Sequence, residues 1–103
     1  MEKLVAYKRM PVWNKDTMPE AVQRKHNTKV GTWGKITVLK GTLKFIELTE
    51  DGEVIAEHFF EAGADNPIAQ PQAWHRVEAA TYDVEWYLEF YCKVEDYFPT
   101  KYN

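Results

Sequence analysis

A histidine directly after a tryptophan is the residue of this chain best placed to do chemistry. His75 follows Trp74 and a turn that contains Pro71, and it begins a run typical of a β-strand. An imidazole held rigidly there can bind a metal ion, carry a proton or anchor a polar ligand. The alternative is structural, with the ring bonded to a loop carbonyl and ordering the entry to the strand. The question is which partners the rest of the chain supplies for His75.

Length and composition predict one cytoplasmic domain spanning residues 1–103. A chain of 103 residues has too little apolar surface for a second core. Its only cysteine, Cys92, excludes an intramolecular disulfide framework and suits a reducing compartment. No run has the length of a signal peptide or of a membrane span, so we expect no membrane partner. A net charge of −3 gives no general attraction to nucleic acid.

The apolar pattern predicts strands almost throughout. Ile36 and Val38 alternate with polar residues, and Gly41 follows, so we expect a hairpin around Gly41. Asp51-Gly52 predicts a second hairpin turn. Further strands are expected over residues 53–60 and 74–80, with a loop over residues 61–73. Several short strands with regular turn signals indicate an antiparallel sandwich or small barrel, hence an all-β fold.

The last predicted strand has two distinct faces. Its apolar face holds Val84, Trp86, Leu88, Phe90 and Cys92, and its polar face holds Glu85, Tyr87, Glu89 and Tyr91. The first thirty residues are less regular. An edge strand is expected over residues 7–13, one helical turn over residues 19–23, and extended chain over residues 23–29.

Four segments together resemble a known family. They are residues 26–35, Val38–Gly41, Pro71–Glu78 and Phe90–Cys92. They are similar to the N-terminal domain of tellurite resistance protein TehB and to the related stand-alone YeaR-like proteins, over essentially the whole chain. This resemblance implies a single small cupin-like antiparallel barrel, also described as a double-stranded β-helix or jelly roll.

Two departures from the family pattern matter. Longer TehB proteins continue into an S-adenosylmethionine-dependent methyltransferase domain, which we do not expect in this chain, because it ends at Asn103 without a glycine-rich nucleotide loop. The usual ligands of a metal cupin are also missing. The positions of the expected glutamate and histidines are occupied by Gly34, Thr28 and Val30.

The resemblance implies that His75 corresponds to the histidine in the second conserved motif of cupins. A metal site at His75 therefore remains one of the expectations. A barrel can bring His26 beside the strand that holds His75, so His26 is the natural second ligand. Zinc, iron or nickel would need a third ligand. Glu89 is the first candidate, ahead of His58, Glu78 and Glu57. Each of these has a plainer interpretation as a solvated surface group.

Aromatic side chains offer candidates for the walls of a pocket. Trp74, Tyr87 and Tyr91 are predicted to line it, with packing in the core as the alternative. Serine is absent, which excludes serine hydrolase chemistry, and there is no Walker or Gly-x-Gly-x-x-Gly pattern.

Three functions remain open from the sequence. The first is a binding module for a small molecule or oxyanion, linked to tellurite resistance or stress and acting either alone or beside a separate methyltransferase. The second is a metal-dependent enzyme, such as an oxygenase or isomerase. The third is an assembly module, because cupins often pair into homodimers through edge strands. The expected cofactor is a divalent transition metal, and S-adenosylmethionine is not expected.

Overall fold

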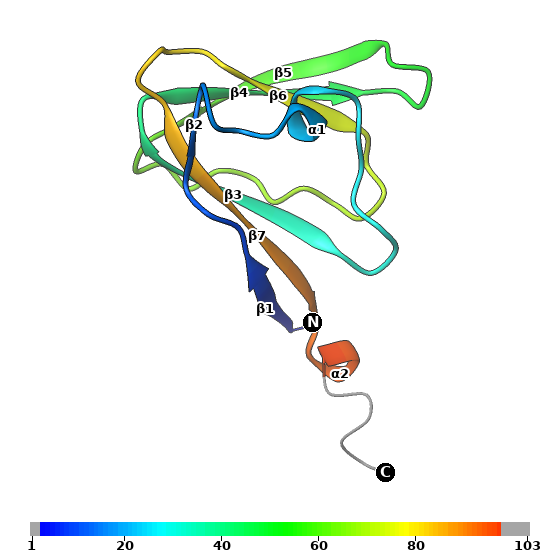
Figure 1. Cartoon of the computed structure of the whole chain (residues 1–103). Coiled ribbons are helices and arrows are strands. Elements are labelled where there is room, and N and C mark those ends of the chain that lie inside the picture. Colours follow the sequence, from blue (N-terminus) through cyan, green and yellow to red (C-terminus); the bar gives the residue numbers. More distant parts are fainter. Residues whose placement is uncertain (1–2, 98–103) are drawn as a thin grey trace.

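The computed structural model describes residues 3–97, which form two antiparallel sheets that face each other (Figure 1). In chain order the elements are β1 (Leu4–Arg9), β2 (Trp13–Asn14), α1 (Glu20–Gln23), β3 (Trp33–Lys40), β4 (Thr42–Leu48), β5 (Val54–Glu61), β6 (His75–Ala79), β7 (Glu85–Lys93) and α2 (Val94–Tyr97). The short helix α1 confirms the helical turn expected from the sequence, whereas α2 was not predicted.

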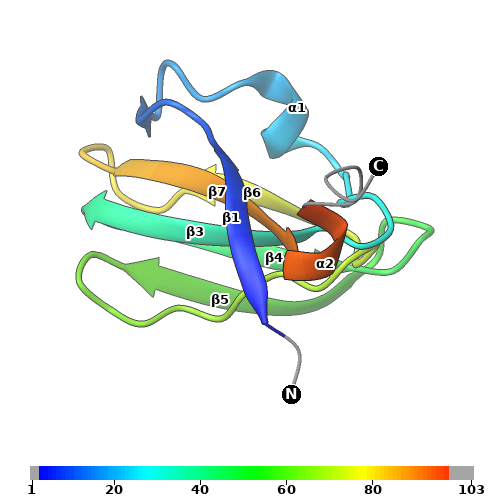
Figure 2. The same ribbon diagram turned by 90° about the horizontal axis from the view of Figure 1, so that it is seen from below.

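The first sheet is built around β7. Strand β3 pairs with one edge of β7, and β1 and then β2 pair with the other edge. Pro11 lies between β1 and β2, as expected for a residue that cannot donate a backbone hydrogen bond. In Figure 2, β1 lies in front of β7, and its residues pair with residues 89–93 of that strand in antiparallel register. Strand β7 therefore holds this sheet together.

The second sheet has the order β5-β4-β6. The predicted turn at Asp51-Gly52 is confirmed, because β4 and β5 pair directly across it. Gly52 has a φ of 92°, and its N–H donates to the carbonyl of Thr49 at 2.9 Å. Such a φ strains any residue with a Cβ, which explains glycine at this point.

The predicted hairpin at Gly41 is wrong. Strand β3 pairs with β7, whereas β4 pairs with β5 and β6, so the chain crosses from one sheet to the other at Gly41. A turn residue between two strands is equally compatible with a hairpin and with a crossing. Gly41 has a φ of 69° and packs closely against Thr81 and Asp83 of the turn before β7.

Apolar side chains from both sheets fill the space between them. The buried cluster contains Trp13, Met18, Ile36, Val38, Leu43, Phe45, Phe60, Val77, Val84 and Trp86. The two indoles pack edge to face, with ring centroids 5.2 Å apart. Trp13 and Trp86 are therefore core residues.

The all-β, antiparallel class is confirmed, but the described residues do not form a closed barrel. The two sheets remain separate, and single bridges at His26–His75 and Gly34–Ala69 add only one further segment to each. Within residues 3–97, neither short helix has the length or the apolar character needed to cross a bilayer.

The crossing at Gly41 predicts a large loss of stability for Gly41→Ala. A Cβ there would collide with the Thr81 hydroxyl and lie 2.6 Å from Oδ1 of Asp83, in a backbone conformation that already disfavours alanine. We expect the free energy of unfolding in urea to fall by about 3 kcal/mol. The control is Gly63→Ala, where φ is 78° but no atom lies within 4 Å. It should cost only about 1 kcal/mol, and equal losses would contradict this account.

Candidate functional site

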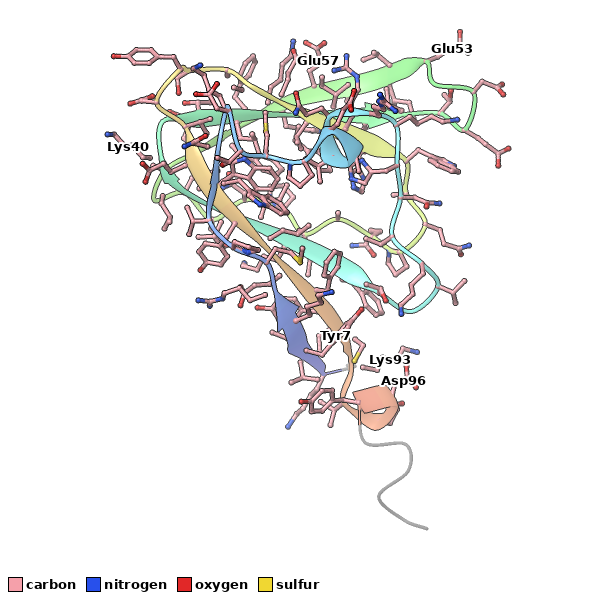
Figure 3. The ribbon with its side chains drawn as sticks, viewed as in Figure 1. Tyr7, Lys40, Glu53, Glu57, Lys93 and Asp96 are labelled. Carbon is pink, nitrogen blue, oxygen red and sulfur yellow. The ribbon has the colours of Figure 1, made fainter. Side chains whose placement is uncertain are left out.

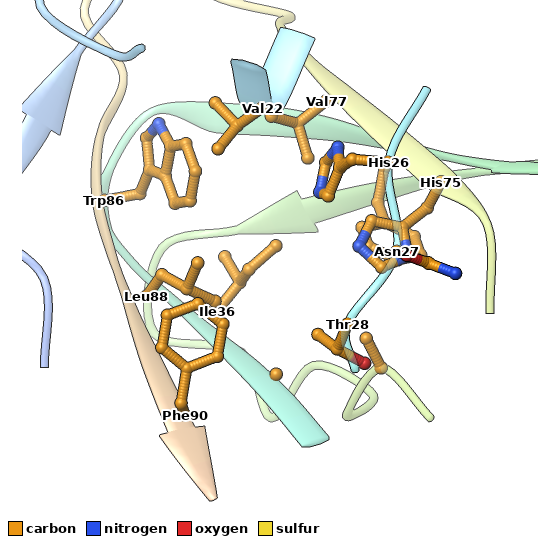
Figure 4. A pocket seen from close by; sticks show the side chains of 13 residues that line it. Val22, His26, Asn27, Thr28, Ile36, His75, Val77, Trp86, Leu88 and Phe90 are labelled. Carbon is orange, nitrogen blue, oxygen red and sulfur yellow. The ribbon is translucent and has the colours of Figure 1, made fainter. Parts of the chain in front are cut away.

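A cavity of about 110 Å³ lies between the two sheets (Figure 4). Its walls are mostly apolar and come from both sheets and from α1, namely Val22, Gly34, Ile36, Phe45, Ala69, Val77, Trp86, Leu88 and Phe90. The polar groups on its lining belong to His26, Asn27, Thr28 and His75. Figure 4 shows both imidazoles on the side of the cavity opposite Leu88.

A backbone bridge brings the two histidines together. The N–H of His26 donates to the carbonyl of His75 at 3.0 Å, and the N–H of His75 donates to the carbonyl of His26 at 2.9 Å. This bridge adds the extended segment after α1 to the edge of β6. The expectation that the fold places His26 beside the strand of His75 is therefore confirmed.

The imidazole rings are in direct contact. Their centroids are 4.4 Å apart and their planes meet at 82°. Nδ1 of His26 lies 2.8 Å from the carbonyl oxygen of Arg24, which can only accept, so Nδ1 carries the proton. In the neutral ring, Nε2 of His26 is then an acceptor. Nδ1 of His75 is buried and has no hydrogen-bond partner of normal geometry.

Burial keeps both rings uncharged at neutral pH. The pKa of His75 is lowered to about 4, first by loss of solvent and then by the nearby His26, against smaller opposing effects of the Ala73 carbonyl and Glu47. Burial also lowers the pKa of His26, against the effect of the Arg24 carbonyl. The site therefore presents neutral groups that can donate or accept hydrogen bonds.

Two tertiary contacts tie the loop before β6 to the cavity. Gly34 and Ala69 exchange two backbone hydrogen bonds, of 3.0 and 2.7 Å. Gln72 has a φ of 64°, unusual for a residue with a side chain, and its N–H donates to the Thr28 carbonyl at 2.9 Å. Sequence reasoning did not single out Gly34 as a lining residue or Gln72 as an anchor, because neither role has a local sequence signal.

A second hollow of about 150 Å³ lies on the other side of Phe45 and His75. Trp74 lines this hollow and not the first cavity, and Nζ of Lys25 sits 4.7 Å from its ring centroid. The hollow also holds His58, which is hydrogen-bonded to Glu47. Glu47 was missed by the sequence analysis, although its alternation with Phe45 could have placed it on the inner face of β4.

The structure does not bring Glu89, Tyr87 or Tyr91 to the histidines. Successive residues of a strand point to opposite faces, and Trp86, Leu88 and Phe90 are the β7 residues that line the cavity. On the other face, Oε2 of Glu89 accepts hydrogen bonds from Arg9 at 3.0 and 3.2 Å. The Arg9 guanidinium also lies over the ring of Tyr87, 4.5 Å from its centroid.

The fold and the cavity define a small two-sheet β-domain with a ligand-sized internal space. The sequence comparison agrees and is more specific, because residues 8–88 match the TehB-like domain family. The chain belongs to this family, which confirms the resemblance inferred from its motifs.

Named relatives show how the chain compares with longer proteins. It is 64% identical, over 98% of its length, to the Haemophilus influenzae protein named probable S-adenosyl-L-methionine-dependent methyltransferase TehB, and it spans only 35% of that protein. It is 27% identical to the uncharacterized protein YeaR of Escherichia coli K12, over 82% of this chain and 75% of YeaR.

Two crystal structures resemble the fold. The structure of TehB from Haemophilus influenzae aligns over 97% of this chain and 35% of its own chain, with a TM-score of 0.90 and 65% identity. A structure of a protein from Escherichia coli K12 aligns over 85% of this chain and 89% of its own, with a TM-score of 0.78 and 26% identity.

The predicted cofactor, a divalent transition metal held by His26, His75 and Glu89, is wrong. Within residues 3–97, no three or more His, Cys, Asp or Glu side chains are grouped so that they could hold a metal ion. Glu89 cannot complete such a group, because it faces away from His26 and His75. The expectation that S-adenosylmethionine plays no part is also contradicted, because the Haemophilus influenzae relatives, at 62 and 64% identity, are named probable S-adenosyl-L-methionine-dependent methyltransferases.

The lowered pKa of His75 predicts a loss of stability in mild acid. Above pH 6.5 the ring is neutral in both states. Between pH 6.5 and 4 the unfolded chain binds a proton that the folded chain does not, so the free energy of unfolding falls with pH, by about 3 kcal/mol. Urea unfolding across this range should show the fall, and His75→Gln should remove most of it. Asn27→Ala, a neutral change on the same cavity, should keep it, and an unchanged slope in His75→Gln would contradict the assignment.

Proposed function

We propose that this chain is a cupin-like binding domain for a small, neutral polar molecule. The observation that carries the proposal is the contact between two uncharged imidazoles on the lining of a mostly apolar cavity. Small-molecule sites combine apolar walls with a few fixed polar groups in the same way. Nδ1 of His75 also supports the proposal, because it is buried without a hydrogen bond of normal geometry and buried polar atoms normally have one.

The size of the cavity limits the occupant. An apolar cavity of about 150 Å³ is enough to hold benzene. At about 110 Å³, this cavity suits a somewhat smaller molecule, of roughly five non-hydrogen atoms. Nε2 of His26 is available to accept a hydrogen bond from such a ligand, and the hydroxyl of Thr28 also reaches the lining.

The electrostatics favour a neutral ligand over an oxyanion. An anion in an apolar site needs a compensating charge, and His26 and His75 are neutral at pH 7. The basic residues of the surrounding segments do not line the cavity. Arg24 pairs with Glu20, and Arg76 pairs with Glu78.

The cupin-like assignment rests on how the chain is connected. Consecutive strands β3 and β4 belong to different sheets, and the sheets enclose the site between them, as in a jelly roll. In this proposal residues 1–103 act as one binding domain in the cytoplasm. We assign methyl transfer to the remaining part of the longer relatives, because about two thirds of the Haemophilus influenzae protein lies outside the matched segment. The family resemblance suggests that the binding domain and the methyltransferase act together in tellurite resistance.

Assembly into a homodimer is the second candidate function. Strand β5 lies at the end of its sheet, and Val54, Ile55 and Phe59 on it are more than half exposed. An edge strand with apolar side chains can pair with a second copy. This edge differs from the one over residues 7–13 that the sequence suggested. Sedimentation of the wild type and of Phe59→Lys would test it, because only a dimer formed through β5 should dissociate.

Ligand binding is tested with the cavity-filling variant Gly34→Ala. The added methyl would make ordinary contacts of 3.6 to 3.8 Å with Leu88, Thr28 and Ala69, so the fold should tolerate it while the cavity shrinks. NMR titrations with 2-propanol, acetamide and dimethyl sulfoxide at pH 7.5 should shift the Val77 and His75 signals. We expect Gly34→Ala to weaken these shifts at least tenfold.

The matched control is Thr37→Val, on the face of β3 away from the cavity, which should bind like the wild type. Tellurite and sulfate, titrated in parallel, should leave the His75 signals unchanged. If tellurite alone shifts these signals and the shifts disappear in His75→Gln, the ligand is an oxyanion and the proposal of a neutral ligand is wrong. No shift with any probe would reject the binding proposal.

The role in tellurite resistance predicts a cellular phenotype. Cells that depend on this chain should lose tellurite tolerance with His26→Ala/His75→Ala, because the polar part of the site is removed. Phe59→Lys, which alters only the exposed edge, should leave tolerance unchanged. Growth across a tellurite series measures both variants, and the opposite ranking would favour the assembly function.

A further inference from the structure

We propose that a methyltransferase domain docks onto the surface where the described residues, 3–97, begin and end. We call this surface the terminal hollow and define it by Tyr7, Lys29, Val30, Thr32, Cys92 and Asp96. The inference rests on the proposed association with a methyltransferase and adds the place where the two meet.

Both exits of the described chain lie at this surface. Leu4 and Lys93 are paired in the register of β1 with β7, and the N–H of Val94 donates to the carbonyl of Lys3 at 3.1 Å. Figure 3 shows Tyr7, Lys93 and Asp96 at one end of the molecule and Lys40 at the other. The chain therefore enters and leaves the described residues beside the terminal hollow.

The longer relatives contain such a polypeptide. The Haemophilus influenzae protein matches 98% of this chain with only 35% of its own length, so about two thirds of it lies outside the match. That remainder must connect to the matched segment through one of the two exits. Whichever exit connects the two parts, the connection leaves the matched segment at the same end of the fold, beside the terminal hollow.

The terminal hollow has the shape and chemistry of a protein contact. It has a volume of about 500 Å³ and is lined by residues of β1, β7, α2 and the loop before β3. Val30 is 75% exposed at this surface. Lys29 and Asp96 provide one charge of each sign, and the Tyr7 hydroxyl is hydrogen-bonded to that of Thr32 at 3.3 Å. An apolar contact with a polar rim is typical of protein interfaces.

A neighbouring hollow shares lining residues with this surface and with the ligand cavity. It has a volume of about 340 Å³ and shares Tyr7, Lys29 and Thr32 with the terminal hollow. It also contains Asn27, Thr28 and Phe90, all of which line the cavity between the sheets. A domain seated on the terminal hollow therefore lies next to the Asn27–Thr28 side of the cavity, so a bound molecule would face the methyltransferase.

The first test is a hydrogen-exchange footprint. In the full-length Haemophilus influenzae relative, this chain replaces the matched segment, which differs at about a third of its positions. Peptides covering residues 27–32 and 92–97 should exchange at least fivefold more slowly in this fusion than in the chain alone. Peptides from β5 should exchange equally in both. Protection at β5, or no protection at residues 27–32, would overturn the docking site.

The second test is a pair of substitutions with opposite placement. Val30→Asp should remove the protection of residues 27–32 in the fusion, because it puts a charge on the apolar contact. Tyr82→Asp is the control, since Tyr82 is 84% exposed and precedes the start of β7, whereas the hollow lies at its end. Equal effects of the two variants would reject the proposal. In the isolated chain both should unfold at the wild-type urea concentration, which excludes misfolding as the cause.

The two proposals fail separately. The footprint is recorded without a ligand, and the titrations that compare Gly34→Ala with the wild type use the chain alone. Loss of ligand shifts with an intact footprint would reject the binding function only. Ligand shifts without the footprint would reject the docking surface only.

Discussion

The pairing of β7 with β1, β2 and β3 is the constraint on which the rest of the structure depends. It makes β7 the centre of one sheet, and strand geometry then divides its side chains between two faces. Trp86, Leu88 and Phe90 face the other sheet and form one wall of the cavity. Glu89 faces the opposite side and pairs with Arg9. The last residues of β7 pair with the start of β1, so the described residues begin and end at the same surface.

The site itself depends on one further contact, the bridge between His26 and His75. Two backbone hydrogen bonds, of 3.0 and 2.9 Å, place the imidazoles edge to face inside a mostly apolar space. Desolvation then keeps the rings uncharged at neutral pH, since burial disfavours the protonated form. The same burial that makes the pair expensive to protonate makes it suitable for a neutral hydrogen-bonding ligand.

Much of the fold could be predicted from the sequence, because period-two alternation is a local property. The alternation predicted β5, β6 and β7 close to their observed bounds and placed a strand at Ile36 and Val38, within β3. Asp51-Gly52 predicted its hairpin correctly. The connection at Gly41 could not be predicted, since one glycine with a positive φ serves both a hairpin and a crossing between sheets. The candidate site was predicted in part. His26 and His75 were identified, but Glu47, Gly34 and Gln72 were not.

The sequence by itself determined which residues share a strand face, which turns need glycine, and which family the chain resembles. These properties depend on neighbours along the chain. Only the tertiary structure decided which faces meet. It placed His26 against His75 across 49 positions of sequence (75 − 26), turned Glu89 away from both, and enclosed a small cavity between the sheets. Such placements depend on the order of strands within the sheets, which the local alternation of apolar and polar residues does not encode.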